Sequence, residues 1–392
     1  MNVLTINCGS SSLKLALCSV DGAAVTSLAR GAVEAIGDDA SIVFESGKGP
    51  KSRSSAPVKD HGDALRRLLD LLGEERRGSI HAIGHRIVQG GAFAQPATID
   101  DEVVHAIEAG RRLAPLHNGP SLEGINAARE SLPNIAMVAV FDTTFHATIP
   151  SVAAQYALPQ EWTLKHGLRR YGYHGIAHRS MTERYAELTG TPHDGVCVIT
   201  LQLGNGCSAT AVDQGVSIDT SMGFTPLEGL MMGTRPGDVD PGALSYLLRE
   251  EGLSPDELDE ILNTKSGLLG VSGTTGDMAS LLREEAQGHP RAHAAIEMFC
   301  YRVRKYIGAY LAVVGRANAI VFGGGIGERS AEIRRRICEP LRQMGIDIDS
   351  ARNTEMVGDG RFSCDESAIA AWVIGSDEER IIAQDTFDVV AK

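Results

Sequence analysis

The amino-acid sequence predicts an α/β protein made of two related domains, and three observations support this prediction. The chain has 392 residues, which is longer than a single compact core usually accommodates. LTINCGSSSLKLALCSVDGAAV near the N-terminus shares its plan with TLQLGNGCSATAVDQGVSI in the middle of the chain, since each reads as a strand, a glycine-containing turn and two further strands. Strand-like and helix-like segments follow both stretches in mixed order, which is typical of the α/β class. The likeness of the two hairpin segments could alternatively arise by chance.

The first half of the chain opens with a hairpin whose loop is unusual. INCGSSSLKLAL, residues 6–17, reads as a strand, a loop of small and hydrogen-bonding residues, and a returning strand. Such a loop lets backbone N–H groups approach an anion, as phosphate-binding turns do. An ordinary serine-rich loop followed by an exposed lysine fits the same residues. The apolar patterns then predict a strand at 82–91, a helix at 121–131 and a strand at 135–142.

The second half begins with another hairpin, at residues 196–212. A helix is predicted in 254–262, because Ser-Pro-Asp-Glu is a typical capped start. Apolar residues at helical spacing predict a long helix over 291–314, whose apolar face we interpret as core or as a subunit interface. Residues 319–330 read as a buried strand, a glycine turn and a helix.

Composition and charge exclude several classes of partner. The net charge is −13, from 50 acidic and 37 basic residues, which argues against a nucleic-acid or anionic-membrane partner. No run of about 20 apolar residues occurs, so we expect no membrane span. The seven scattered cysteines include no CxxC pair, and the N-terminus has no signal-peptide pattern. We therefore expect a reduced, cytoplasmic protein without a thiolate metal site.

Three glycine turns are candidates for binding phosphate groups. GGGIGE at 323–328 lies between a predicted strand and a helix, where backbone and helix N-terminal N–H groups can meet an anion. One such turn is a weak signal, because tight packing also selects glycine. GSSS and GNG in the two hairpins make three turns, which suits the phosphate chain of a nucleotide.

Two arginines lie in glycine-bounded segments. Arg235 is isolated in TSMGFTPLEGLMMGTRPGDVDPG, and it could either contact an anionic substrate or form a salt bridge with Asp238 or Asp240. Arg86 lies in the similar setting GHRIVQGG.

Two further residues are candidates on weaker grounds. His174 lies in RYGYHGIAH, where a packed core histidine is the more common outcome. Asp142 ends the strand of IAMVAVFD, a usual position for a site carboxylate in an α/β sheet, although a turn-capping aspartate fits as well.

Taken together, these motifs resemble the acetate and propionate kinase family, within the superfamily of sugar kinases, Hsp70 and actin. The likeness extends from Asn7 to Ala383, and GFTPLEG…GTRPGD is its most specific part. The other matching motifs are NCGSSSLK, HRIVQGG, APLHNGPSLEGI, FDTTFH, RYGYHGIAHR, LGNGCSATAV, FGGGIGERSAEIR and DEERIIA.

The resemblance implies an α/β fold of duplicated ribonuclease H-like (actin-like ATPase) domains around a nucleotide cleft. The N-terminal domain, 1–145 plus 380–392, would bind the acyl and phosphoryl groups. The C-terminal domain, 146–379, would bind the nucleotide and form a homodimer.

The resemblance also implies the reaction: reversible transfer of a phosphoryl group from ATP to acetate, giving acetyl phosphate and ADP. Mg²⁺ would be the cofactor, with Mn²⁺ as a substitute, and the partners would be small molecules only. Propionate, another short-chain acid or a different phosphoryl donor such as pyrophosphate are alternatives. A non-catalytic nucleotide-switching scaffold is a rival, but it would not need Arg86, Arg235 and His174 beside a phosphate loop.

Each matched position acquires an expected role. The catalytic residues would be Asp142, Arg86, Arg235 and His174. Asn7 and Glu378 would hold the metal. The acyl group would meet Arg86, Val88, Leu116, Tyr173 and Pro226. The phosphates and nucleoside would meet Ser10, Ser12, Lys14, Gln202, Leu203, Gly204, Asn205, Gly206, Gly323, Gly324, Gly325, Ile326 and Gly327.

Three positions depart from the family's usual residues. Gln202 stands where the family has His, and it can donate a hydrogen bond but cannot carry charge. Tyr173 replaces Phe, and Arg329 replaces Asn after GIGE. These departures bear on turnover, on the acyl pocket and on the choice of phosphoryl donor.

Overall fold

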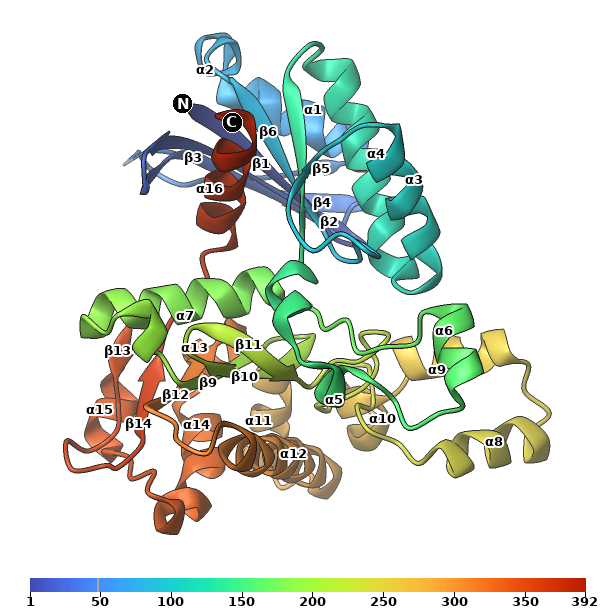
Figure 1. The fold of residues 1–392 in the computed structure, drawn as a ribbon, viewed down its shortest axis with the longest axis vertical. Coiled ribbons are helices and arrows are strands. Elements are labelled where there is room, and N and C mark those ends of the chain that lie inside the picture. The colour runs from blue at the N-terminus through green and yellow to red at the C-terminus, as the bar shows by residue number, and fades with distance from the viewer. Residues whose placement is uncertain (48) are drawn as a thin grey trace. The chain divides into compact units, whose positions relative to one another are not determined.

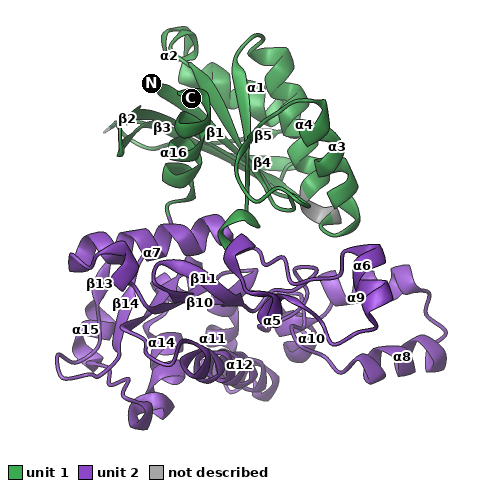
Figure 2. Ribbon diagram, viewed as in Figure 1, with its two compact units in different colours: residues 1–145, 377–392 green, residues 146–376 purple. Residues whose placement is uncertain are grey.

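The computed structural model describes residues 1–47 and 49–392, except for the side chains of residues 115–117. The chain forms two compact units, shown in Figure 2. Unit 1 comprises Met1–Phe145 and Asp377–Lys392, and unit 2 comprises His146–Ser376. The return to unit 1, expected at residue 380, begins at Asp377, because its side chain caps the helix α16 (Glu378–Val390).

Unit 1 is built on an eight-stranded sheet in the order β5-β4-β3-β2-β1-β6-β8-β7. Neighbouring strands from β5 to β1 are antiparallel, whereas β1, β6 and β8 run parallel. The strands are β1 (Asn2–Cys8), β2 (Ser12–Asp21), β3 (Ala24–Glu34), β4 (Asp39–Ser46), β5 (Ser52–Pro57), β6 (Ala82–Ile87), β7 (Ala97–Thr98) and β8 (Ala136–Phe141). Besides α16, the helices are α1 (His61–Leu72), α2 (Glu74–Gly78), α3 (Asp101–Ala109) and α4 (Pro115–Ser131).

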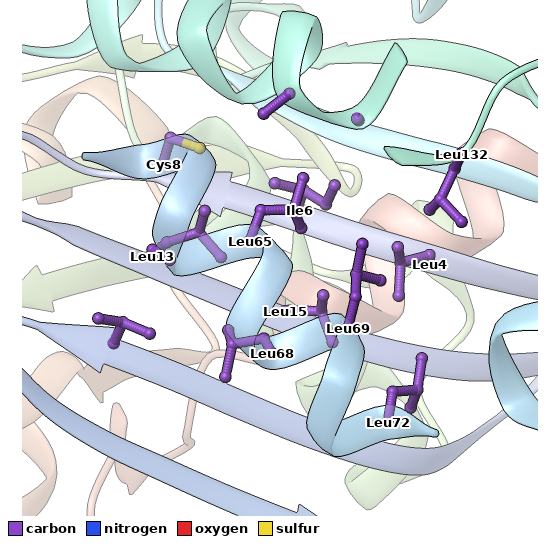
Figure 3. Packing of buried hydrophobic residues seen from close by; sticks show 14 of the residues in the cluster. Leu4, Ile6, Cys8, Leu13, Leu15, Leu65, Leu68, Leu69, Leu72 and Leu132 are labelled. Atoms are coloured by element: carbon purple, nitrogen blue, oxygen red, sulfur yellow. The ribbon is translucent and has the colours of Figure 1, made fainter. Parts of the chain in front are cut away.

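The core of unit 1 follows from the alternation of side chains along its central strands. Figure 3 shows the leucines of α1 packed against one face of β1 and β2. The opposite face carries Val3, Ala16 and Val20, which pack with Ala383 of α16. Each fully buried leucine stabilises the fold by roughly 1.5–3 kcal/mol. The central sheet is therefore covered on both faces, and this fixes the strand ends that carry the site.

Unit 2 repeats this plan around a six-stranded sheet in the order β11-β10-β9-β12-β14-β13. Its strands are β9 (Val198–Leu203), β10 (Cys207–Asp213), β11 (Val216–Thr220), β12 (Ala319–Gly323), β13 (Gly360–Arg361) and β14 (Ala370–Val373). Its helices, labelled in Figure 1 where room allows, are α5 (Ser151–Ala154), α6 (Gln160–His166), α7 (Gly175–Thr189), α8 (Pro241–Glu250), α9 (Pro255–Thr264), α10 (Gly267–Ser272), α11 (Met278–Ala286), α12 (Pro290–Val314), α13 (Gly324–Arg329), α14 (Ala331–Cys338) and α15 (Ser350–Glu355).

The two sheets confirm the predicted duplication. The order β3-β2-β1-β6-β8 in unit 1 corresponds to β11-β10-β9-β12-β14 in unit 2, with the same antiparallel and parallel pairings. The predicted capped helix is α9, in which Ser254 and Glu257 form a capping box. One predicted element began too late: α4 starts at Pro115 instead of residue 121, because a proline suits the first helical position. Among the described residues, no helix combines the length and apolar character needed to cross a bilayer.

Candidate active site

Unit 1 gathers four of the predicted residues at one edge of its sheet. Asn7 lies near the end of β1, Arg86 near the end of β6, Asp142 directly after β8, and Glu378 at the start of α16. These strands are parallel, so their carboxyl ends meet at the same edge. The structure therefore brings predicted residues from distant parts of the chain into one polar cluster.

Arg86 is the centre of this cluster. Its Nη2 and Nε donate to the two carboxylate oxygens of Asp142 at 2.6 and 3.1 Å, and its Nη1 donates to Asn7 Oδ1 at 3.2 Å. Glu378 Oε2 lies 3.6 Å from Arg86 Nε and accepts from Asn7 Nδ2 at 3.2 Å. Burial opposes the charge of Arg86, but Asp142 and Glu378 raise its pKa above the ordinary value. Asp142 thus orients Arg86 by a bidentate ion pair.

The serine-rich loop lies beside this cluster in the same unit. Asn7 and Lys14 are directly opposite each other on β1 and β2, so the lysine extends from the same face as the amide. The loop is closed by a hydrogen bond from the Gly9 N–H to the Ser12 carbonyl at 2.8 Å. The Gly9 carbonyl lies 2.8 Å from His61 Nε2. The loop that carries Ser10 is thus held from both sides.

In unit 2, Arg235 has no counter-ion among the residues that the structure describes. Its Nη1 donates to the Pro226 carbonyl at 2.9 Å, and burial lowers its pKa. Asp238 accepts instead from the Tyr306 hydroxyl at 2.9 Å, and Asp240 caps α8. Among the described residues no carboxylate pairs with Arg235, so the local salt bridge is not formed. A partly buried cation of this kind is a ready partner for a bound anion.

The side chains of Arg235 and His174 both lie next to the turn between β9 and β10. A Cβ atom on Gly206 would lie 2.8 Å from Arg235 Nη2 and 3.3 Å from His174 Cε1, so only glycine fits there without displacement. His174 has a φ of 58°, in the left-handed region that non-glycine residues rarely adopt. Such strain costs on the order of 1–3 kcal/mol and persists only where surrounding contacts enforce it.

A cavity of about 690 Å³ lies in unit 2 beside the same turn. This volume is in the range of sites for drug-sized ligands and cofactors. Four predicted residues line it: Gly204, Asn205, Gly325 and Ile326, and the departing residue Arg329 lines it as well. Sequence reasoning missed its other lining residues, which are Thr234, Gly276, Asp277, Met278, Ala279, Leu282 and Ser330. The loop VSGTTGD before α11, rich in small and turn-forming residues, was the signal available for them.

The remaining nucleotide-binding candidates lie where β9 meets β12. Gln202 is opposite Ser208 on one side and Gly323 on the other, and its Oε1 is buried without a hydrogen-bond partner. Gly324 has a φ of 74°, and a Cβ atom there would lie 2.5 Å from the Leu203 carbonyl oxygen. The glycine turn is thus packed directly against the end of β9.

The acyl-pocket candidates fall in different units. Val88 is buried just after β6 in unit 1. Tyr173 and Pro226 are buried in unit 2, and the Tyr173 hydroxyl donates to the Phe224 carbonyl at 2.8 Å. The side chain of Leu116 lies outside the described residues.

The predicted metal ligands offer a minimal donor set. Asn7 supplies an amide oxygen and Glu378 a carboxylate, and the described residues contain no cluster of three or more His, Cys, Asp or Glu suited to a metal. Mg²⁺ is commonly bound by one or two carboxylates together with substrate phosphates and water. The residues present fit that mode of binding.

Comparison with known proteins gives a consistent picture. Residues 2–384 match the acetokinase family. The chain is 48% identical to the acetate kinase of Brachyspira hyodysenteriae over 99% of this chain and 100% of that one. Its structure is similar to those of Porphyromonas gingivalis acetate kinase (TM-score 0.89, 40% identity, 99% of both chains) and of a propionate kinase from Francisella tularensis (TM-score 0.92, 40% identity, 99% of both chains). Since both the sequence match and the fold extend over almost the whole chain, the protein belongs to the acetokinase family.

Proposed function

We propose that this chain is an acetate kinase, which reversibly transfers the γ-phosphoryl group of ATP to acetate and gives acetyl phosphate and ADP. The observation that carries the proposal is Arg235, a partly buried cation that pairs with no carboxylate among the described residues. It lies beside the glycine turn that adjoins the large cavity of unit 2. Family membership supports the same reaction.

The chemistry explains why the site is rich in positive charge. Acetate is an anion at neutral pH, so it needs no general base to become a nucleophile. The obstacle is repulsion between its carboxylate and the phosphate chain, together with the charge that develops during transfer. Arginines held in fixed positions offset both, because preorganised charges stabilise the transition state without reorganising.

Unit 1 supplies the acceptor side of the reaction. Arg86, oriented by Asp142, contacts the acyl and phosphoryl oxygens, and the loop with Ser10 and Ser12 binds the phosphoryl group. Asn7 and Glu378, whose side chains are hydrogen-bonded to each other, would hold Mg²⁺. When bound, Mg²⁺ neutralises phosphate charge in the transition state. The acyl group meets Val88 in this unit and Tyr173 and Pro226 in unit 2.

Unit 2 supplies the nucleotide side. The nucleoside occupies the cavity between the start of α11 and α13, with Gly325 and Arg329 on its wall. The phosphates lie along Gly204–Gly206, where Arg235 and His174 converge. His174 donates a hydrogen bond to a phosphoryl oxygen.

Propionate is a second candidate substrate. The propionate kinase from Francisella tularensis is as similar in fold and identity as the acetate kinase from Porphyromonas gingivalis. One methylene group changes binding in an apolar pocket by only about 1–3 kcal/mol, so both acids are plausible ligands of one pocket.

The assembly and location that we propose are a homodimer in the cytoplasm. Unit 2 exposes large apolar side chains, with Val152 90%, Leu164 76% and Trp162 55% accessible, and such surfaces mark interfaces. All seven cysteines are free, as a reducing compartment would keep them.

An assay in the acyl-phosphate direction tests the proposed function. Acetyl phosphate and propionyl phosphate are supplied with Mg²⁺ and either ADP or orthophosphate, and the formation of ATP or pyrophosphate is measured. We expect ATP from ADP, with acetyl phosphate giving the higher kcat/KM. Turnover with orthophosphate alone would replace ATP by pyrophosphate, and turnover with neither would refute the proposal.

A further inference from the structure

A buried chain of imidazole and hydroxyl groups connects the sheet of unit 2 to His174. Thr200 Oγ1 lies 2.7 Å from His178 Nδ1, and His178 Nε2 lies 2.7 Å from Ser208 Oγ. Ser208 Oγ is in turn 2.9 Å from His174 Nδ1. His178, Ser208 and Thr200 are buried, and none of the three has a role in the reaction described above.

The fold places these groups in line for simple geometric reasons. Gln202 and Thr200 are opposite Ser208 and Thr210 on the paired strands β9 and β10, so all four share one face of the sheet. His174 occupies the N-cap position of α7, and His178 follows one helical turn later on the same side of that helix. The polar face of the strands and this side of α7 therefore meet.

The number of available protons restricts these hydrogen bonds to two arrangements of donors and acceptors. Ser208 has one hydroxyl proton and two imidazole neighbours, so it donates to one and accepts from the other. Burial holds the pKa of His178 well below its ordinary value, so this ring is neutral, with one donor and one acceptor nitrogen. If Thr200 donates to His178 Nδ1, then His178 Nε2 donates to Ser208, and Ser208 donates to His174 Nδ1. The proton of neutral His174 is then on Nε2. The reverse order places that proton on Nδ1.

We propose that Thr200, His178 and Ser208 are positioning residues that fix the plane of the His174 ring and keep Nε2 as its donor atom. This inference rests on the proposed function, in which His174 donates to a phosphoryl oxygen. An acceptor at Nε2 selects the first arrangement. His174 Nε2 lies on the side of the turn, 3.4 Å from where a Cβ atom of Gly206 would be.

Substitution of Thr200 tests the proposal, because Thr210 provides a matched control elsewhere on the same pair of strands. Thr210 is opposite Thr200 and is equally buried, and its hydroxyl forms a hydrogen bond of 2.8 Å with Thr220 Oγ1 and none with a histidine of the described residues. Thr200→Val and Thr210→Val each remove one buried hydroxyl with little change of shape. We expect Thr200→Val to lower kcat about tenfold with little change in either KM, because a misplaced ring fails mainly in the transition state. Thr210→Val should retain kcat, and Thr200→Ser should restore it.

Nitrogen NMR of labelled histidines provides a readout that does not depend on turnover. The His174 signals are assigned by their loss in His174→Gln. The wild type should show neutral His174 protonated at Nε2, and Thr200→Val or Ser208→Ala should give mixed tautomers. Equal kcat in the two valine variants, or an unchanged His174 tautomer in Ser208→Ala, would overturn the proposal that these residues position His174. An inactive wild type with the expected NMR result would refute the proposed function but not the positioning of His174.

Discussion

The two arginines of the site are embedded in opposite ways. Arg86 forms an ion pair with Asp142, which is fully buried, whereas Arg235 donates to the Pro226 carbonyl and pairs with no carboxylate of the described residues. Removing one partner of a buried ion pair leaves an uncompensated charge, whereas removing a partly buried cation that has no carboxylate partner among the described residues leaves none. The same substitution should therefore have different effects on stability at the two positions.

We predict that Arg235→Gln and Arg86→Gln both lower kcat/KM about 10²–10³-fold, as loss of one preorganised charged contact does. Arg86→Gln should also reduce the free energy of unfolding by about 3–5 kcal/mol, because the buried carboxylate of Asp142 loses its bidentate ion pair. Arg235→Gln should keep or raise it. Urea titrations and steady-state kinetics check both effects. An Arg235→Gln enzyme with more than about a tenth of wild-type activity would assign Arg235 a structural role.

Gln202 gives a second prediction at this scale. Its buried Oε1 finds no hydrogen-bond partner in the part of the chain that the structure describes, so the side chain does not stabilise the neighbouring turn through that atom. Gln202→His should preserve or raise kcat and add an ionisation between about pH 6 and 7, with higher kcat on the acid side, where the ring is charged. The profile of kcat against pH measures this. A flat profile would mean that the side chain does not reach the phosphoryl group, and Gln202→Ala controls for loss of packing.

At the scale of elements, the sequence predicted the strands and hairpins better than the loops. Period-two patterns and glycine turns locate β1, β2, β9 and β10, because these signals are local. The walls of the cavity were only partly predictable, because the tertiary fold brings Met278 and Leu282 to the same cavity as Gly325, which is distant in sequence. For Arg235, the local sequence left open whether it contacts an anion or forms a salt bridge, because Asp238 and Asp240 are its nearest acidic neighbours in sequence.

The glycine turn before α13 yields a prediction of its own. A Cβ atom on Gly325 would meet nothing within 4 Å, yet this residue lines the cavity. Gly325→Ala should therefore raise the KM for ATP several-fold with an unchanged Tm, because the methyl group occupies ligand space only. Gly308→Ala, on the open surface of α12, is the matched control and should change neither KM nor activity. If ATP binds the Gly325→Ala enzyme normally, the nucleoside does not occupy this cavity.

At the scale of the whole molecule, the proposed reaction needs residues from both units. The chain passes between them at Phe145–His146 and again at Ser376–Asp377. Acyl phosphates hydrolyse, so transfer must exclude water, and enzymes achieve this by closure on the substrates. The two covalent connections are compatible with such a movement.

We expect ADP, Al³⁺, fluoride and acetate together to reduce the radius of gyration measured by small-angle scattering. The physical reason is that a transition-state mimic binds only when both sets of residues engage it. The Arg235→Gln variant should show a much smaller change at the same concentrations. An identical radius for wild type with and without the mimic would argue against closure.

The position of α16 has a consequence for how the protein is made. A ribosome synthesises Asp377–Lys392 only after the whole of unit 2, although this segment completes unit 1. Until then, Val3, Ala16 and Val20 lack their cover, and Arg86 lacks Glu378. We therefore expect the nascent unit 1 to remain incomplete until translation ends, whereas unit 2 is one continuous segment that can fold first. We therefore expect a chain that ends before Asp377 to retain the cavity of unit 2 but to lack kinase activity.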